Sequence, residues 1–153
     1  MSPRVARCPS LYTLPEDPAA STKLRGGRCS SGHIFFPPQQ LGCTTCGAHG
    51  EGIEIIELEA SGELRSHALS HREKRPGSDL PLIIGTVALD AGPLIEVVLA
   101  VDDVAVLECG QRVTGRLVEI AEAGGKEETG EGEEAEIIVD CFFAPAGCSA
   151  GAA

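Results

Sequence analysis

Two cysteine motifs lie close together in residues 23–50, and their spacing suits metal binding. Cys43 and Cys46 form a C-x-x-C-G motif, whose tight turn brings two thiolates together while the glycine supplies left-handed backbone freedom. Upstream, Cys29 is followed by Gly32, where a complete ribbon would have a second cysteine, and then by His33. Three thiolates and one imidazole are a common closed tetrahedral set for zinc. The spacing therefore predicts a zinc site made of Cys29, His33, Cys43 and Cys46.

The residues leave alternatives to this ligand set open. His49 is a competing imidazole, and a degenerate motif that has lost its metal would leave His33 as an ordinary exposed histidine. A redox role for the C-x-x-C pair is disfavoured because no thioredoxin-like βαβ pattern surrounds it. A closed four-ligand site has no open position for water, so it stabilises folding and does not catalyse.

Other reactive side chains have simpler interpretations than catalysis. His67 and His71 share one face of an expected strand, which permits a second metal site or an acid–base pair, but exposed strand histidines are the favoured interpretation. Cys109 and Cys141 are expected to act as small core hydrophobes, and Cys8 and Cys148 to be incidental. The sequence has no nucleophile elbow, and the glycines at 124–132 lie among glutamates that would repel phosphate. We expect no catalytic residue in this chain.

Composition excludes several classes of protein. The formal net charge of −11 and the 3% aromatic content oppose nucleic-acid binding, which needs clustered cations and stacking side chains. No run of 18 apolar residues is present, and residues 1–7 lack the apolar segment of a secretory signal, so a cytoplasmic location without a membrane partner is expected. Seven cysteines, an odd number, do not suggest a disulfide framework there. Metal binding explains the clustered ones better.

Composition and residue pattern divide the chain into segments and predict a mainly β fold. Residues 1–22 contain four prolines and are expected to be an extended arm with at most a short helix at 17–22. Residues 23–50 fit no helix or long strand and need a metal staple. Residues 51–145 show β patterns at 52–59, 63–71, 80–90, 94–101, 113–120 and 136–143, which predict a five-stranded OB-type Greek-key barrel. The segment 63–71 is expected to be a second strand after 52–59 or the far arm of a hairpin with it. An acidic Gly-rich loop at 121–136 and a flexible tail at 146–153 complete the division.

Cationic residues gather near the ribbon and the first barrel loop. They are Lys23, Arg25, Arg28, Arg65, Arg72, Lys74 and Arg75. In an acidic chain, such a zone would suit the phosphates of CoA or an acidic partner surface. Ordinary surface charge is the alternative, and the sequence favours it slightly.

The order of these motifs resembles a known family. Leu-Arg-Gly-Gly-Arg-Cys at 24–29 is followed by Phe-Phe-Pro-Pro at 35–38, the C-x-x-C-G motif, Ser-Gly-Glu-Leu-Arg-Ser at 61–66, Pro-Leu-Ile-Ile-Gly-Thr-Val-Ala-Leu-Asp at 81–90 and Cys-Gly-Gln-Arg-Val at 109–113. This order, over roughly residues 22–143, is similar to thiolase-associated proteins that join a rubredoxin-like zinc ribbon to an OB fold. The departure at Gly32 concerns the ligand set more than the fold.

The resemblance implies an accessory subunit with structural Zn²⁺. Members of this family bind a thiolase-fold catalytic subunit in a hetero-oligomer and help to form or cover its acyl-CoA site, in ketothiolase, aldolase or acyltransferase complexes. CoA or acyl-CoA would then be shared with the partner, which would supply the chemistry. The alternative hypothesis is a stand-alone OB-fold binding module with a structural zinc.

Overall fold

The structure, a computed structural model, describes residues 3–17, 22–38, 41–123 and 136–146. It is built of strands with two short 3-10 turns, Gly50–Gly52 and Val104–Val106. Most of the expected helix at 17–22, most of the acidic loop at 121–136 and nearly all of the tail at 146–153 lie outside the described residues. The mainly β prediction is confirmed.

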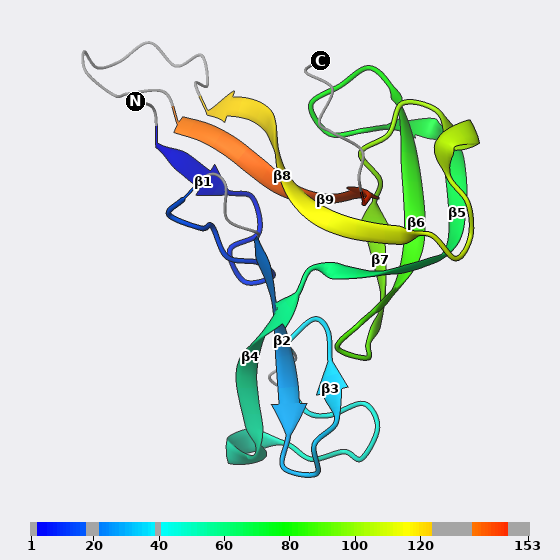
Figure 1. The fold of residues 1–153 in the computed structure, drawn as a ribbon. Helices are drawn as coiled ribbons and strands as arrows, with labels where there is room; N and C mark the ends of the chain where they lie inside the picture. Colours follow the sequence, from blue (N-terminus) through cyan, green and yellow to red (C-terminus); the bar gives the residue numbers. More distant parts are fainter. Residues whose placement is uncertain (1–2, 18–21, 39–40, 124–135, 147–153) are drawn as a thin grey trace, which may run out of the picture.

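A small sheet forms one end of the molecule, at the bottom of Figure 1. It contains β2 (Lys23–Cys29), the two-residue β3 (Ile34–Phe35) and β4 (Ile53–Glu59), in the order β3-β2-β4, and both pairings are antiparallel. Gly26 and Gly27 let β2 lie in this sheet, because a Cβ on either would come within 3 Å of Leu58 or Phe35 side-chain atoms. The strand β2 corrects the expectation that no long strand fits residues 23–50.

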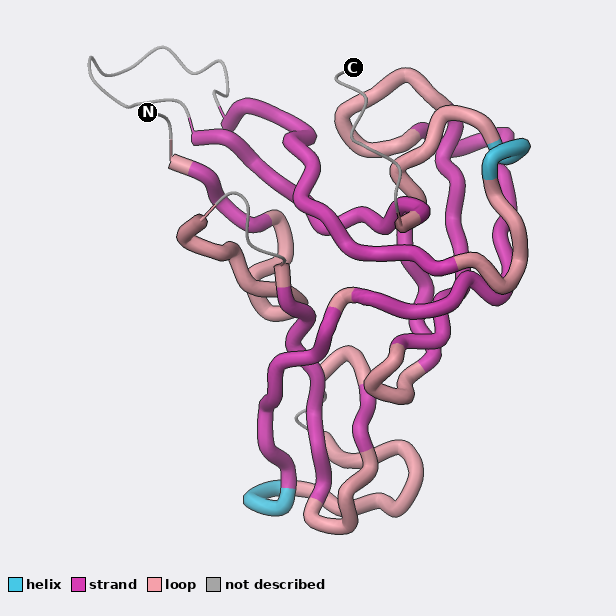
Figure 2. Tube along the Cα trace, in the orientation of Figure 1, coloured by secondary structure: helices cyan, strands magenta, loops and turns pink. Residues whose placement is uncertain are grey.

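A larger, curled sheet forms the other end (Figure 2). Its strand order is β1-β9-β8-β5-β6-β7. The bounds are β1 (Arg4–Ala6), β5 (Ser61–Lys74), β6 (Pro81–Leu89), β7 (Leu94–Val98), β8 (Arg112–Ala123) and β9 (Glu136–Pro145).

The curled sheet closes on itself between β7 and β9. A single parallel bridge joins Leu99 to Phe143, and the Ala100 N–H donates to the Phe143 carbonyl at 2.7 Å. With this bridge the five strands β5 to β9 follow the OB order, in which the third and fifth strands meet in parallel while the others pair antiparallel. The OB-type barrel expected from the sequence is therefore confirmed as an OB-like, curled sheet.

Two strands have partners that the sequence did not indicate. The β4 strand, assigned above to the barrel region, pairs over its whole length with β2 and forms no hairpin with β5. Its neighbour β5 instead pairs with β6 and β8, because those three strands are the ones needed to close the barrel. In the arm, β1 pairs in parallel with β9 and is held by ion pairs from Arg4 to Glu119 and from Arg7 to Asp140.

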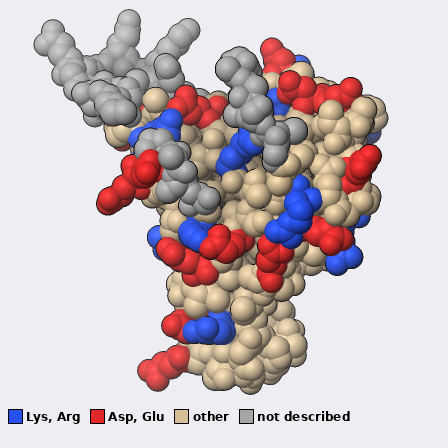
Figure 3. Space-filling model, viewed as in Figure 1, with Lys and Arg blue, Asp and Glu red and all other residues tan. Residues whose placement is uncertain are grey.

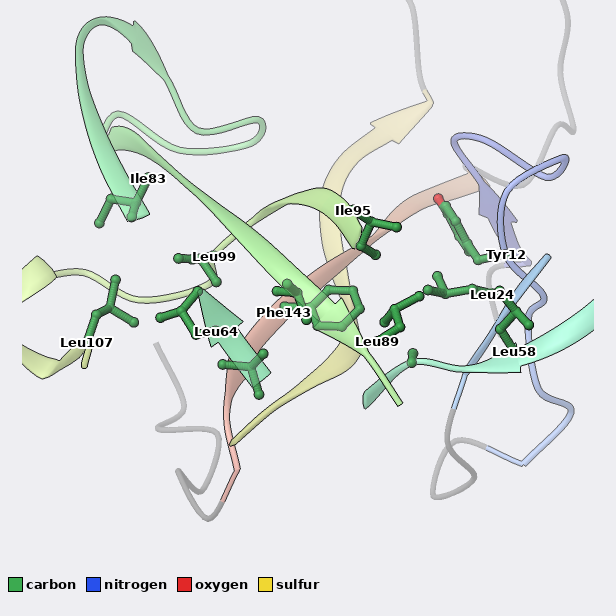
Figure 4. Close-up of a cluster of buried hydrophobic side chains, with 13 residues drawn as sticks. Tyr12, Leu24, Leu58, Leu64, Ile83, Leu89, Ile95, Leu99, Leu107 and Phe143 are labelled. Carbon is green, nitrogen blue, oxygen red and sulfur yellow. The ribbon is translucent and has the colours of Figure 1, made fainter. Parts of the chain in front are cut away.

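One apolar cluster runs from the barrel to the start of the small sheet. Figure 4 shows Leu64, Leu99 and Phe143 near its middle, with Leu107 at one end and Tyr12, Leu24 and Leu58 at the other. The core is mostly aliphatic, as the composition requires, and its two largest fully buried residues are Phe142 and Phe143. Since Leu24 and Leu58 come from the small sheet, this packing fixes the sheet against the barrel. Over the described residues, no helix has the length and apolarity needed to cross a membrane.

Candidate metal centre

The structure brings the four predicted metal ligands together at the far end of the small sheet. Cys29 is the last residue of β2, His33 directly precedes β3, and Cys43 and Cys46 lie in the loop that leads to β4. One ligand atom from each lies within 4.8 Å of those of the other three. This is the one group of three or more metal-ligating side chains in the part of the chain that the structure describes.

The distances between donor atoms suit a tetrahedral zinc ion. With Zn–S bonds near 2.3 Å and Zn–N bonds near 2.0–2.1 Å, tetrahedral angles place two sulfurs about 3.8 Å apart, and a sulfur and a nitrogen about 3.5 Å apart. The Cys29 and Cys46 Sγ atoms are 3.7 Å apart, and Cys29 Sγ is 3.3 Å from His33 Nδ1. These distances therefore fit a zinc ion, and Nδ1 is the ring nitrogen of His33 that lies beside Cys29 Sγ.

The first motif shows how His33 comes to lie beside the cysteines. The Gly32 N–H donates to the Cys29 carbonyl, and the Cys29 N–H donates to the His33 carbonyl, so His33 lies where the chain leaves this tight turn. Gly32 has φ of +88°, a conformation that strains any residue with a Cβ. Position 32 thus suits glycine, and the longer side chain of His33 reaches back to the thiolates.

The second motif is a tight turn stabilised by backbone donors. The Gly47 N–H donates to the Cys43 carbonyl at 2.9 Å, and the Thr45 N–H points at Cys43 Sγ at 3.4 Å. Backbone N–H groups, that of Cys46 first and that of Thr45 after it, lower the pKa of the Cys43 thiol to about 6. The Ala48 N–H lowers the pKa of Cys46, but burial and the thiols of Cys29 and Cys43 outweigh it and raise that pKa overall. Thiols this close compete for negative charge, which a bound cation would relieve.

Little apolar packing supports the site apart from its own ligands. The buried cluster around it contains Cys29, Phe35 and Cys43, with Ala48 and Ile53 against it. Leu41 on the neighbouring loop is 93% exposed. The segment buries too little to hold its shape by the hydrophobic effect alone, as the sequence indicated.

The other candidate residues lie elsewhere. His49 is exposed and its Nδ1 lies 3.3 Å from the Gly47 carbonyl, outside the ligand group. His67 is half-buried and His71 is exposed, and neither belongs to a metal-binding group among the described residues. Cys109 is exposed rather than a core residue, because it lies in the turn before β8. Cys141 is partly buried against the core, and this burial, with a smaller contribution from Asp140, raises its pKa to about 12.

The predicted cationic zone is largely neutralised. Five of its seven cations have a carboxylate oxygen within 4.0 Å: Lys23 with Glu59, Arg28 with Glu54, Arg65 with Glu63, Lys74 with Asp79 and Arg75 with Asp102. Figure 3 shows this interleaving of positive and negative side chains over one face. Ordinary surface charge accounts for the zone better than a phosphate site does.

Comparisons with known proteins agree with this structure. The family model described as ChsH2, rubredoxin-like zinc ribbon domain, matches residues 17–51. Among solved structures, the chain is similar to one described as Ltp2-ChsH2(DUF35) aldolase, with 21% identity, a TM-score of 0.56, and coverage of 81% of this chain and 85% of that one. A DUF35-family protein of unknown function from Sulfolobus solfataricus is 15% identical over 77% of this chain and 76% of its own, but its TM-score of 0.42 says little about fold. No curated protein matches the sequence.

The ribbon match covers all four clustered donors, and the likeness to the aldolase-associated chain extends across the barrel. Together they confirm the resemblance seen in the sequence. Residues 17–51 thus match a ChsH2-type, rubredoxin-like zinc ribbon, and the whole chain resembles, in fold, a solved chain that carries this ribbon.

Proposed function

We propose that this chain is the accessory subunit of a thiolase-like acyl-CoA enzyme, with a structural zinc ion held by Cys29, His33, Cys43 and Cys46. It binds a thiolase-fold catalytic subunit and helps to form or cover the acyl-CoA site. The four-donor cluster carries the proposal, because four protein donors complete a tetrahedral site and leave no position for a substrate or an activated water. Zinc in such a site supplies folding free energy rather than Lewis-acid catalysis.

Two further observations support an accessory role. The solved chain of similar fold is described as part of an aldolase together with a second protein, Ltp2. Within the described residues of this chain, no second group of three or more metal-ligating side chains is found, and burial keeps Cys141 protonated. Chemistry on an acyl thioester would therefore be supplied by the partner.

Co-expression with a thiolase-fold protein encoded beside it tests the proposal. We expect a stable hetero-oligomer with one zinc per copy of this chain, and acyl-CoA turnover by the complex that exceeds turnover by either protein alone. Separate elution of the two proteins, together with full activity of the thiolase-fold protein alone, would refute the accessory role. Metal analysis of the purified chain tests the zinc site independently.

The stand-alone binding module remains the competing hypothesis. It expects this chain to bind its ligand without a second protein, and an oligonucleotide is the natural probe for an OB fold. The paired cations and the net charge of −11 oppose that ligand. Salt-dependent oligonucleotide binding by the isolated chain would favour this alternative over the accessory role.

A further inference from the structure

The barrel is open along most of the seam between β7 and β9. The two strands meet only at the Leu99–Phe143 bridge, and β7 is the terminal strand of the sheet. Beside β9, the arm strand β1 covers residues up to Val139, where the Arg7 N–H donates to the Val139 carbonyl. Between that bond and the Leu99–Phe143 bridge, no strand among the described residues lies in the seam.

The unpaired edge of β7 presents backbone groups at two positions. The Leu99 N–H donates to the Ile83 carbonyl and the Leu89 N–H to the Pro93 carbonyl, so odd-numbered residues face β6. Backbone groups alternate along an antiparallel strand, so those of Leu94 and Glu96 face away from β6. In the part of the chain that is described, no hydrogen bond to these groups is found. Leu94 is also 63% exposed, so this edge is accessible.

An apolar cavity lies beneath this edge. Its volume is about 230 Å³, and it is lined by residues 95–98 of β7, residues 140–143 of β9 and side chains of the arm and the ribbon, including Cys8, Tyr12 and Phe36. A cavity of roughly 150 Å³ is already large enough to hold benzene. This cavity therefore has room for one aromatic or large aliphatic side chain, but not for a whole strand.

We propose that the β7 edge and this cavity are the docking site for an extended segment of the thiolase-fold partner. The segment adds a strand beside Leu94 and Glu96, and one of its apolar side chains enters the cavity. Backbone edges recognise other backbones and pockets select the side chain, which is the usual division of roles in strand addition. This inference rests on the function proposed above.

The charge at the β7 edge indicates which residue type flanks the partner's apolar side chain. Glu96 has no cation within ion-pairing distance among the described residues, whereas Asp140 across the seam is paired with Arg7 at 3.1 Å. A basic residue beside the apolar anchor would complement Glu96 and the negative chain as a whole. A second copy of this chain, paired antiparallel about Glu96, would instead bring two carboxylates together. The edge thus favours a different protein over self-association.

A pair of substitutions at one position tests the proposal. Glu96→Pro removes the outward N–H without removing a bond to β6, and proline is tolerated on edge strands. Glu96→Ala keeps the N–H and removes only the carboxylate. In the complex with the thiolase-fold subunit, we expect Glu96→Pro to weaken affinity at least about tenfold and Glu96→Ala about threefold or less, the latter loss shrinking at high salt.

A second variant serves if Glu96→Pro lowers the melting temperature or the zinc content. Cys8→Phe places a ring in the cavity without changing any residue of β7, and Cys109→Phe is its control on a remote exposed turn. We expect only Cys8→Phe to weaken the complex.

The possible failures are distinguishable. If the wild-type chain binds no thiolase-fold subunit, the proposed function is wrong, and the docking site for that subunit is wrong as well. If the complex forms and the Glu96 and Cys8 variants bind like their controls, the docking site alone is wrong. A wild-type homodimer that Glu96→Pro converts to a monomer would assign the edge to self-association and overturn the proposal.

Discussion

The ribbon and the barrel hold their chains in place by different means. The barrel buries residues such as Leu64, Val87, Leu99 and Val113 completely, and its strands pair with their neighbours except along most of the β7–β9 seam. The far end of the ribbon buries Phe35 and two of the proposed zinc ligands, Cys29 and Cys43. One end therefore depends on apolar surface, and we expect the other to depend on the affinity of four donors for a metal ion.

Because of this contrast, the two ends should respond to different perturbations. Loss of metal should act on the ribbon first, and loss of core volume should act on the barrel first. The point of contact is Leu24 and Leu58, which belong to the ribbon sheet but pack in the barrel cluster. Through this contact, a change at one end can reach the other.

Metal removal should produce the largest effect. Structural zinc supplies apparent folding free energies of roughly 10–16 kcal/mol in small zinc domains, and the ribbon has little else to replace it. We expect a chelator to raise amide hydrogen exchange strongly in Cys29–His33 and in the Cys43–Ile53 loop, with β6, β8 and β9 remaining protected. Equal loss of protection in both regions would show that the ribbon and the barrel unfold as one unit.

Substitution of the histidine ligand should sharpen the same contrast. His33→Ala removes the donor atom that lies 3.3 Å from Cys29 Sγ, so zinc affinity should fall by more than the roughly 10–100-fold typical of losing an outer-shell partner. The matched control is His49→Ala, which removes an exposed imidazole outside the cluster. Competition with a chromogenic chelator measures both affinities. Equal affinities for the two variants would remove His33 from the ligand set.

A cavity in the barrel core should lower the stability of the barrel and leave zinc binding by the ribbon almost unchanged. Leu64 is 0% exposed, so Leu64→Ala should reduce the free energy of unfolding by about 2–5 kcal/mol. Zinc affinity should stay within about twofold of wild type, since Leu64 does not touch the metal cluster. Denaturant titration and metal competition on the same sample provide the two measurements. A matching loss of zinc affinity would indicate strong coupling between barrel and ribbon.

Alkaline pH should act at the junction of the arm and the barrel. Tyr12 is the only tyrosine, it is 4% exposed, and its hydroxyl donates to the Val139 carbonyl at 2.8 Å. Burial, chiefly, raises its pKa to about 12. Because the folded state holds the proton more tightly, the contribution to stability is complete below pH 10 and is lost as pH rises towards 12. The loss should reach about 2–3 kcal/mol.

The Tyr12→Phe variant is the control for this pH dependence. It should be less stable at neutral pH by about 1 kcal/mol, because the bond to Val139 is absent. It should also lack the decline assigned to Tyr12 between pH 10 and 12. Near-ultraviolet absorbance follows the phenol directly in the wild type. A phenol that titrates near pH 10 would show that the hydroxyl is not buried in solution.

Local patterns were enough to predict much of this arrangement. The C-x-x-C-G motif and the Cys29-x3-His33 spacing predicted four residues that the structure brings together, because metal ligands near a turn are fixed by short-range geometry. The barrel strands followed from β-branched runs with turn residues between them. The division into arm, ribbon and barrel stays a prediction, as does the ligand role of each donor.

Long-range pairing was the part that local patterns could not supply. Nothing in the residues of β4 shows that its partner is β2 rather than a barrel strand. A strand of alternating Ile and Glu can pair in the small ribbon sheet or in the barrel sheet equally well. Gly26 and Gly27 argued against a strand, yet they are needed there because Leu58 and Phe35 pack closely against them. The parallel pairing of β1 with β9 joins residues more than 130 positions apart, and it sets where the open part of the β7–β9 seam begins.

The passage from β4 to β5 has a mechanical consequence. Only Ala60 separates the two strands, it is buried, and its carbonyl accepts the Gly115 N–H at 2.7 Å. A Cβ at position 115 would come within 2.7 Å of Ala60 Cβ, so this crossing has no spare room. The two ends therefore lack a flexible joint at this point. A force applied at the metal-binding end would therefore act as a torque on the barrel strands, rather than produce a hinge motion at Ala60.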